Sequence, residues 1–244
     1  PFHAPGLHLT DHSFRVPLDH AAPDGPAIDL FARTATAPAR AGNADLPHLL
    51  FLTGGPGFEA PRPSGATAWL KAAASHFRIV LLDQRGTGRS SPVLDAAGLA
   101  DAAGSADPAA QAGFLAHFRA DAIVRDAEAV RASLVPAGSP QRGRWSVMGQ
   151  SFGGFVACTY LSLAPEGLTE VMLAGGLLPA ISLPCAADAA YGALYDRVAA
   201  QNAKFYARFP GDASRAREVV LALAEGRGPA GVEGEAAAGP GPAS

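Results

Sequence analysis

Two short, continuous apolar runs, each followed at once by a glycine-rich loop, most constrain what this chain can fold into. LPHLLFLT over Leu46–Thr53 ends at Gly54-Gly55-Pro56-Gly57, and FRIVLLD over Phe77–Asp83 ends at Gln84-Arg85-Gly86-Thr87-Gly88. Strands that are apolar on both faces are typical of parallel sheets covered by helices on both sides. We therefore expect a mostly parallel sheet whose strands end in glycine-rich loops.

The rest of the chain alternates between short strands and longer helices. Apolar residues recur near a 3.6-residue period over Ala109–Leu134, which predicts a helix, whereas Ile28–Thr36 alternates apolar and polar residues like a half-buried strand. This alternation predicts an α/β fold. Further strands are expected over Phe14–Pro17, Trp145–Met148 and Thr169–Ala174, and further helices over Ala66–Ser75, Phe152–Ala164, Ala186–Phe209 and Ser214–Glu225.

The helix expected over Ala109–Leu134 carries a charged face. Acidic and basic side chains stand close together there, a pattern typical of solvated pairs on a helix surface. We expect surface pairing from these residues rather than catalysis. They are Arg125, Asp126, Glu128 and Arg131.

The composition and the pattern of apolar residues change at two points along the chain, and these changes predict three segments. Residues 1–180 hold all the expected strands and form the N-terminal part of an α/β core. Residues 181–225 contain only helical patterns and are expected to begin a helical cap. Residues 226–244 are low-complexity Gly, Pro and Ala with little to bury, so we expect them to be disordered.

Composition excludes several classes of partner. A net charge of −3 without a basic stripe argues against nucleic acid. The longest apolar runs are strand-sized, far below the ~20 residues that a membrane span needs. The first residues have neither the basic start nor the apolar block of a signal peptide, so a cytoplasmic location is expected. Two cysteines cannot form a metal site of the usual four-ligand kind.

The segment Gly149-Gln150-Ser151-Phe152-Gly153 fits the pattern G-x-S-x-G. In a nucleophile elbow the serine is held in a strained turn between strand and helix, and small residues are needed where side chains would collide. The strand expected before this motif and the helix expected after it supply that context. The plainer alternative is a small-residue turn with a capping serine; we predict that Ser151 is a nucleophile.

Acyl transfer also needs hydrogen-bond donors for the oxyanion. One is expected to be the backbone amide of Phe152, directly after the serine. The second is expected from the loop Thr53–Gly57 (TGGPG), at Gly55 or Gly54, because glycine lets the backbone approach a ligand closely. The alternative is a tight turn at a strand end, for which Gly-Pro-Gly is sufficient.

The stretch Asp83–Ser90 (DQRGTGRS) follows the second apolar run. Its glycines permit a sharp exit from the strand, and Asp83 and Arg85 are expected to pair and to brace the neighbouring loops. It matches neither G-x-x-x-x-G-K-[ST] nor G-x-G-x-x-G, so it is not a phosphate-binding loop. We predict that Arg85 is a structural brace rather than a substrate ligand.

Three motifs together, TGGPGFEAPRP, LLDQRGTGRSSP and GQSFGG, resemble the proline iminopeptidase (prolyl aminopeptidase) family of α/β-hydrolases in order and spacing. The resemblance covers Leu7 to Pro179. It implies a serine peptidase that removes an N-terminal proline from peptides without a metal or an organic cofactor. It also implies that Ser151 is the nucleophile, that Gly55 or Gly54 with Phe152 forms the oxyanion hole, and that a helical cap closes the site.

A serine nucleophile needs a base, usually a histidine oriented by a carboxylate, and in this fold class the order is serine, acid, histidine. Every histidine of this chain precedes Ser151. The later aspartates Asp188, Asp196 and Asp212 lie in the cap-like helices. Neither triad partner is assigned, and both are expected to be absent. The seven histidines are His3, His8, His12, His20, His48, His76 and His117.

Two explanations for the missing partners stay open: a truncated hydrolase or a non-catalytic relative. The 226–244 tail favours truncation, because it begins abruptly and resembles out-of-frame translation of a GC-rich gene. Without a base only a residual acceleration remains, of order 10³–10⁴ over water. We therefore expect this chain to be inactive or nearly so. An esterase or another hydrolase on the same scaffold is the alternative chemistry, since fold does not fix substrate; the oligomeric state is not predicted.

Overall fold

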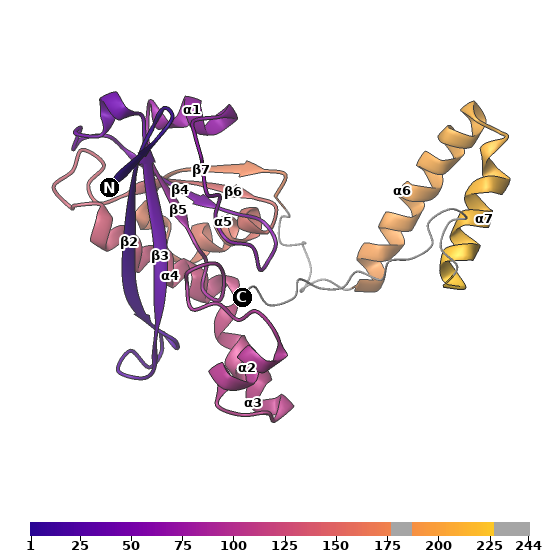
Figure 1. Cartoon of the computed structure of the whole chain (residues 1–244), viewed down its shortest axis with the longest axis horizontal. Helices are drawn as coiled ribbons and strands as arrows, with labels where there is room; N and C mark the ends of the chain where they lie inside the picture. The colour runs from indigo at the N-terminus through magenta and orange to yellow at the C-terminus, as the bar shows by residue number, and fades with distance from the viewer. Residues whose placement is uncertain (177–186, 227–244) are drawn as a thin grey trace, which may run out of the picture. The chain divides into compact units, whose positions relative to one another are not determined.

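The computed structural model describes residues 1–176 and 187–226 of the 244-residue chain (Figure 1). The chain divides into two compact units, Pro1–Pro179 and Ala180–Ser244, which are taken here one at a time. The first unit contains every strand among the described residues. The described residues of the second form two helices.

The first unit is built on a seven-stranded sheet of order β1-β2-β3-β5-β4-β6-β7. β4, β5, β6 and β7 are parallel, whereas β1, β2 and β3 form an antiparallel meander that joins β5. This confirms the predicted mostly parallel sheet. The strands are β1 (Phe2–Ala4), β2 (Leu7–Pro17), β3 (Ala27–Thr36), β4 (His48–Leu52), β5 (Arg78–Leu82), β6 (Trp145–Gln150) and β7 (Leu168–Ala174).

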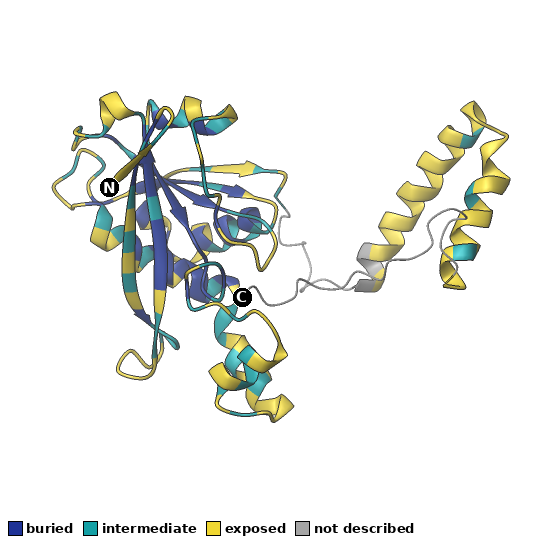
Figure 2. Ribbon diagram, in the orientation of Figure 1, coloured by how far each residue is buried: buried dark blue, intermediate teal, exposed yellow. Residues whose placement is uncertain are grey.

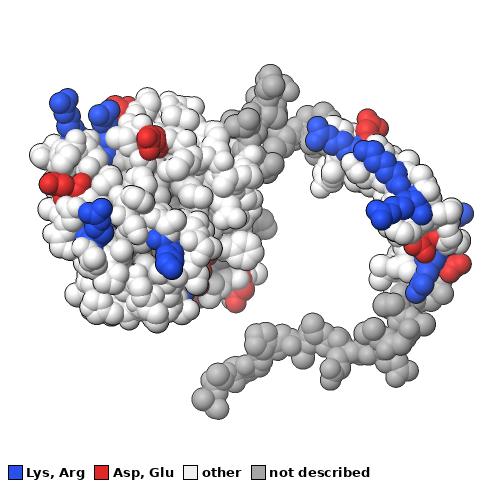
Figure 3. Space-filling model, turned by 90° about the horizontal axis from the view of Figure 1, so that it is seen from above, with Lys and Arg blue, Asp and Glu red and all other residues white. Residues whose placement is uncertain are grey.

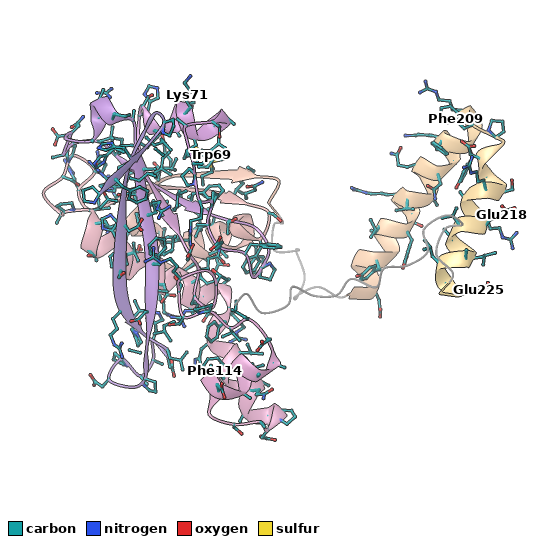
Figure 4. The ribbon with its side chains drawn as sticks, in the orientation of Figure 1. Trp69, Lys71, Phe114, Phe209, Glu218 and Glu225 are labelled. Atoms are coloured by element: carbon teal, nitrogen blue, oxygen red, sulfur yellow. The ribbon has the colours of Figure 1, made fainter. Side chains whose placement is uncertain are left out.

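Helices cover both faces of this sheet and create two core layers. α4 (Ala120–Leu134) and α5 (Phe152–Leu163) pack on one face, around the fully buried Trp145. α1 (Ala68–Ala74) packs on the other, where Trp69, labelled in Figure 4, projects from the helix. The Trp69 ring stacks on Phe51 with ring centroids 4.9 Å apart. The central strands are buried from both sides, as Figure 2 shows in dark blue, and this explains why their sequences are continuously apolar.

The single helix predicted over Ala109–Leu134 is wrong. α3 (Pro108–Leu115) is followed by the 3₁₀ turn Ala116–Phe118, and α4 begins only after Arg119, whose backbone is extended (φ −87°, ψ 172°). The guanidinium of Arg85 donates a 2.7 Å hydrogen bond to the carbonyl of His117, which withdraws that carbonyl from any helical ladder. A further short helix, α2 (Ala96–Ala103), was not predicted from the sequence.

The second unit consists of α6 (Ala187–Arg208) and α7 (Asp212–Ala224), which confirms the two helices predicted there. Large apolar side chains are exposed along both, and Figure 2 shows the two helices mostly in yellow. Their role as a cap stays a prediction. The tail predicted to be disordered lies, apart from Gly226, outside the described residues.

Charged side chains are scattered singly over the face of the first unit that Figure 3 shows, with uncharged surface between them. The helices of the described residues are all too short or too polar to cross a bilayer.

Candidate active site

Ser151 stands at the turn between the end of β6 and the start of α5, with φ 54° and ψ −118°. A positive φ is energetically unfavourable for a residue other than glycine, and residues in such strained conformations cluster at functional sites. The turn is held by hydrogen bonds from Ser151 N to the Ala174 carbonyl, 3.1 Å, and from Gly154 N to the Ser151 carbonyl, 2.9 Å. The serine itself is exposed. The strand, turn and helix that G-x-S-x-G predicts are therefore present, and the serine lies at the surface of the first unit.

The glycines on either side of Ser151 are required by close backbone approach. A Cβ at Gly149 would stand 2.3 Å from the Gly153 carbonyl oxygen, and a Cβ at Gly153 would stand 2.0 Å from the Leu52 carbonyl oxygen. In both cases the obstacle is backbone, which cannot rotate away. The elbow thus docks directly on the end of β4, and only glycine permits it.

The predicted oxyanion loop lies against the elbow. A Cβ at Gly54 would be 2.9 Å from the Cβ and 3.4 Å from the Oγ of Ser151. Gly55 has φ 132°, a conformation that favours glycine. Within the described residues, the backbone N–H groups of Gly54, Gly55 and Phe152 donate to no other group. Two stretches nearly one hundred residues apart therefore bring free donors to one serine.

Asp83 fixes the segment that follows this loop. Its carboxylate is fully buried and accepts hydrogen bonds from the backbone N–H of Ala60, 3.0 Å, and of Arg89, 2.8 Å. Two guanidinium nitrogens of Arg62 donate hydrogen bonds to the two carboxylate oxygens of Asp83. These hydrogen bonds raise the pKa of the Arg62 guanidinium. One buried carboxylate thus ties the oxyanion-loop segment to the loop after β5.

The predicted pair between Asp83 and Arg85 is wrong, because Arg85 points to the other side of β5. It forms a two-nitrogen ion pair with Asp126 of α4, with N–O distances of 2.7 and 2.5 Å. It also donates to the carbonyls of Leu18 and His117. Asp126, predicted to lie on a solvated face, is only 1% exposed. It carries the counter-charge that a buried guanidinium needs.

Gln84, between these two residues, links the two glycine-rich loops. Its side-chain amide donates a 3.0 Å hydrogen bond to the carbonyl of Thr53, and its side chain is buried. Thr53 immediately precedes Gly54 and Gly55. The end of β5 therefore holds the start of the loop that carries the free N–H groups.

All seven histidines are described, and none of them hydrogen-bonds to Ser151. His20 lies 2.8 Å from Asp126 and 3.0 Å from Arg85, and His12 contacts Thr34 at 3.1 Å. His48 is buried at the opposite end of β4 from the elbow, where burial lowers its pKa to about 4. Asp188, Asp196 and Asp212 belong to the second unit. Within the described residues of the first unit, no side chain hydrogen-bonds to Ser151 as a base.

A cavity of about 270 Å³ lies beside the elbow. Its walls include residues of both segments that carry the free backbone N–H groups. Phe152 lines it from one side, and Pro56 and Gly57 line it from the other. The sequence did not reveal it, because its walls come from four separate segments. They are completed by Gln84, Arg85, Gly86, Thr87, Val93, Leu115, Phe118 and Ile123.

No group of three or more His, Cys, Asp or Glu side chains in the described part of the chain is arranged to hold a metal ion. The sequence did not identify Arg62, Gln84 and Asp126 as residues that hold the site in place. For Arg62 and Gln84 the sequence contained one indication: they lie within the motifs TGGPGFEAPRP and LLDQRGTGRSSP.

Comparison with known proteins places these features in a family. The family model described as "alpha/beta hydrolase fold" matches residues 47–222. A proline iminopeptidase of Aeromonas sobria is 50% identical over 206 residues, 84% of this chain and 45% of the relative. A proline iminopeptidase of Aspergillus aculeatus is 38% identical over 88% of this chain and 46% of the relative. The chain thus spans about half the length of these curated relatives.

Among solved structures, an alpha/beta fold family hydrolase from Bacillus anthracis str. Sterne covers 69% of this chain and 44% of its own, with 16% identity and a TM-score of 0.43. The family assignment rests on the model match over most of the chain and on the fold of the first unit. The chain belongs to the α/β-hydrolase fold family.

Proposed function

We propose that this chain carries the nucleophile and oxyanion hole of a serine hydrolase that releases N-terminal proline from peptides through an acyl-enzyme. The observation that carries the proposal is the position of Ser151, exposed at φ 54° with Gly54 against its side chain. In the reaction, Oγ attacks the prolyl carbonyl carbon while the amides of Phe152 and of Gly54 or Gly55 stabilise the oxyanion. The bond from that carbon to the nitrogen of the next residue then breaks, the nitrogen takes up a proton as the shortened peptide leaves, and water hydrolyses the prolyl ester to free proline and Ser151. The names of the two curated relatives support proline as the residue released.

The chemistry of this proposal is limited because no side chain among the described residues of the first unit is placed as a base for Ser151. Proton removal from Oγ is then left to water, and the amides and binding supply only a residual acceleration, of order 10³–10⁴ over water. Asp83 and Arg85 act through structure in this proposal, because both are fully satisfied by other residues.

Reaction with a fluorophosphonate probe tests the nucleophile. We expect slow, saturable labelling that peptide mapping places on Ser151 and that Ser151→Ala removes. Ser162→Ala is the matched control, since Ser162 is an exposed serine on the same helix, and it should leave labelling unchanged. Labelling of Ser151 at the rate of a complete serine hydrolase would contradict the missing base, and labelling elsewhere would contradict the assignment of the nucleophile.

Esterase chemistry is the second candidate, and one observation favours it. The cavity beside Phe152 has no Asp or Glu among its lining residues, so it offers no partner for the charged amine of an N-terminal proline. Comparing the 4-nitrophenyl ester of proline with the 4-nitrophenyl ester of a short acyl chain, which share one leaving group, decides between the two. Faster turnover of the ester at equal concentration would favour the esterase.

A further inference from the structure

We propose that the polar residues at the start of β4 and β5 bind one small tetrahedral oxyanion of the sulfate or phosphate type, held by Arg78, His48 and Thr36. The site lies at the end of β4 opposite to the turn at Ser151, so it does not depend on the proposed function. Register, burial and charge each point to it.

The three residues stand side by side on one face of the sheet. His48 of β4 pairs with Arg78 of β5. On the other side of β5, Ala35 pairs with Ile79, which sets the next residue of β3, Thr36, opposite Arg78. Residues that stand opposite one another in neighbouring strands point to the same face. Because β3, β5 and β4 are consecutive strands of the sheet (Figure 1), Thr36 and His48 flank Arg78 from both sides.

The two flanking side chains are buried polar groups without a partner. Thr36 is 1% exposed and His48 is 6% exposed. Within the described residues, neither Oγ1 of Thr36 nor Nδ1 of His48 forms a hydrogen bond. A buried polar group that stays unsatisfied is destabilising, and native structures contain few of them. A threonine hydroxyl and an imidazole Nδ1–H both donate, so the groups that flank Arg78 can both bind an anion.

Arg78 is a cation without a counter-charge. It is half-buried, and it donates hydrogen bonds only through Nη2, to the carbonyls of Ala41 and Asn43, both at 3.2 Å. Its Nε and Nη1 groups have no partner among the described residues. Every other arginine in the described part of the chain that is not exposed pairs with a carboxylate. These arginines are Arg33, Arg62, Arg85 and Arg131.

The surroundings of this row are basic as well. The charged groups that act on His48 are Arg78 and His12, and together with burial they hold the pKa of His48 at about 4. His8 of β2 stands opposite Thr36 and adds a further basic side chain. His8 and Arg78 are half-buried, so the row is open to solvent. A bound anion would supply the negative charge that these residues lack.

Hydrogen-bond geometry favours a tetrahedral anion. An oxyanion that accepts hydrogen bonds of about 2.8 Å on opposite sides joins donor atoms roughly 7–8 Å apart. Strands lie about 4.8 Å apart, so the backbones of Thr36 and His48 are separated by roughly 10 Å, which suits such an anion. Sulfate and phosphate have four oxygens and can accept from the hydroxyl, the imidazole and the guanidinium together. A planar carboxylate has two oxygens and cannot satisfy all three.

The test is a titration of the whole chain with sodium sulfate, followed by NMR, with sodium chloride holding the ionic strength constant. We expect saturable shifts of the His48 ring resonances. The pKa of His48 should rise from about 4 when sulfate is bound, because a nearby anion favours the imidazolium. Acetate, titrated in the same way, should bind more weakly than sulfate.

Thr36→Val should weaken sulfate binding by about tenfold or more, because a hydrogen bond to a charged acceptor is lost. The fold should tolerate this change, since the hydroxyl it removes has no partner. Arg78→Gln should abolish binding. Thr159→Val is the matched control for Thr36→Val, because the Thr159 hydroxyl already donates to the carbonyl of Phe155.

Arg40→Gln is the control for Arg78→Gln, since it removes an exposed positive charge that lies outside the row. Both controls should leave the sulfate affinity unchanged. Three results would each overturn the proposal: no saturable shift in the wild type, an unaltered sulfate affinity in Thr36→Val, or acetate binding as tight as that of sulfate. Labelling of Ser151 by the fluorophosphonate probe should be the same with and without sulfate, so each proposal fails or holds separately.

Discussion

Gly153, on the first turn of α5, lies so close to the end of β4 that a Cβ on it would stand 2.0 Å from the Leu52 carbonyl oxygen. Leu52 is the last residue of β4, and the loop Thr53–Gly57 follows it directly. The contact therefore sets the distance between the helix that follows Ser151 and the strand that presents Gly54. At the contact between Gly153 and Leu52, packing of backbone atoms alone holds the turn at Ser151 next to the loop that contains Gly54.

Gly153→Ala should destabilise the fold by about 3 kcal/mol or more, at the upper end of overpacking costs, because neither backbone can move without opening the elbow. The free energy of unfolding in urea measures the effect. Gly113→Ala is the control: Gly113 lies within α3 with open space around its α-carbon, and alanine there should stabilise the helix by about 0.5–1 kcal/mol. Equal effects at the two positions would contradict the close contact.

Gly54→Ala should reduce labelling of Ser151 while leaving the protein folded. The added methyl group would press on the Cβ of Ser151 at 2.9 Å and approach Oγ at 3.4 Å, so it displaces the nucleophile rather than the core. The rate of fluorophosphonate labelling and the urea midpoint are measured on the same samples. Gly42→Ala, with nothing near its α-carbon, should change neither quantity; an unaltered labelling rate in Gly54→Ala would place the loop elsewhere.

Asp126→Asn should cost about 3–5 kcal/mol of unfolding free energy, because it leaves the guanidinium of Arg85 buried without a counter-charge. The comparison is Arg125→Ala, which removes the exposed pair with Asp121 from the same helix and should cost less than about 1 kcal/mol. Urea unfolding of both variants checks the difference. Similar small losses in both would mean that Arg85 finds solvent or another acceptor.

His48 should make the protein lose stability as the pH falls. Burial is the main cause that lowers its pKa from 6.5 to about 4, so the unfolded chain takes up a proton that the folded chain refuses. The contribution is complete above pH 6.5 and decreases toward pH 4, by about 2–3 kcal/mol between pH 7.5 and pH 4.5.

Urea unfolding of His48→Gln at both pH values tests this expectation: the variant should lose less stability on acidification than the wild type does. His76→Gln, at an exposed position, should follow the wild type. An unchanged acid dependence in His48→Gln would assign the loss to other groups, including His8 and His12, whose pKa values burial also lowers.

The central strands and the elbow were predictable because each leaves a mark in its own short stretch of sequence, whereas β1 and most of β2 were not predicted. Runs such as FRIVLLD are apolar on both faces only because helices cover both sides of the sheet, and G-x-S-x-G marks a turn where glycine is a steric requirement. The order TGGPG, DQRGTGRS, GQSFGG also anticipated which loops share an edge of the sheet. What these stretches have in common is that the packing they require is visible in the residue types of one short segment.

The rest depended on partners distant in sequence. Asp126 lies three residues after Ile123 and four before Val130, on the buried face of α4, so its spacing indicated burial, yet its charge suggested solvent. Arg85, forty-one residues away, supplies the cation that makes that burial tolerable. The same guanidinium draws the His117 carbonyl out of the helical ladder and separates α3 from α4. The periodicity of apolar residues along a helix carries no information about a contact between residues so far apart in the sequence.

The two tryptophans of the chain lie in different core layers. Trp145 is fully buried between the sheet and the helices α4 and α5, and Trp69 packs on Phe51 under α1. Each layer therefore carries its own built-in fluorophore. In Trp69→Phe the remaining tryptophan fluorescence comes from the layer that supports Ser151, and in Trp145→Phe it comes from the opposite layer. Fluorescence of the two variants can therefore follow the unfolding of each face of the sheet separately.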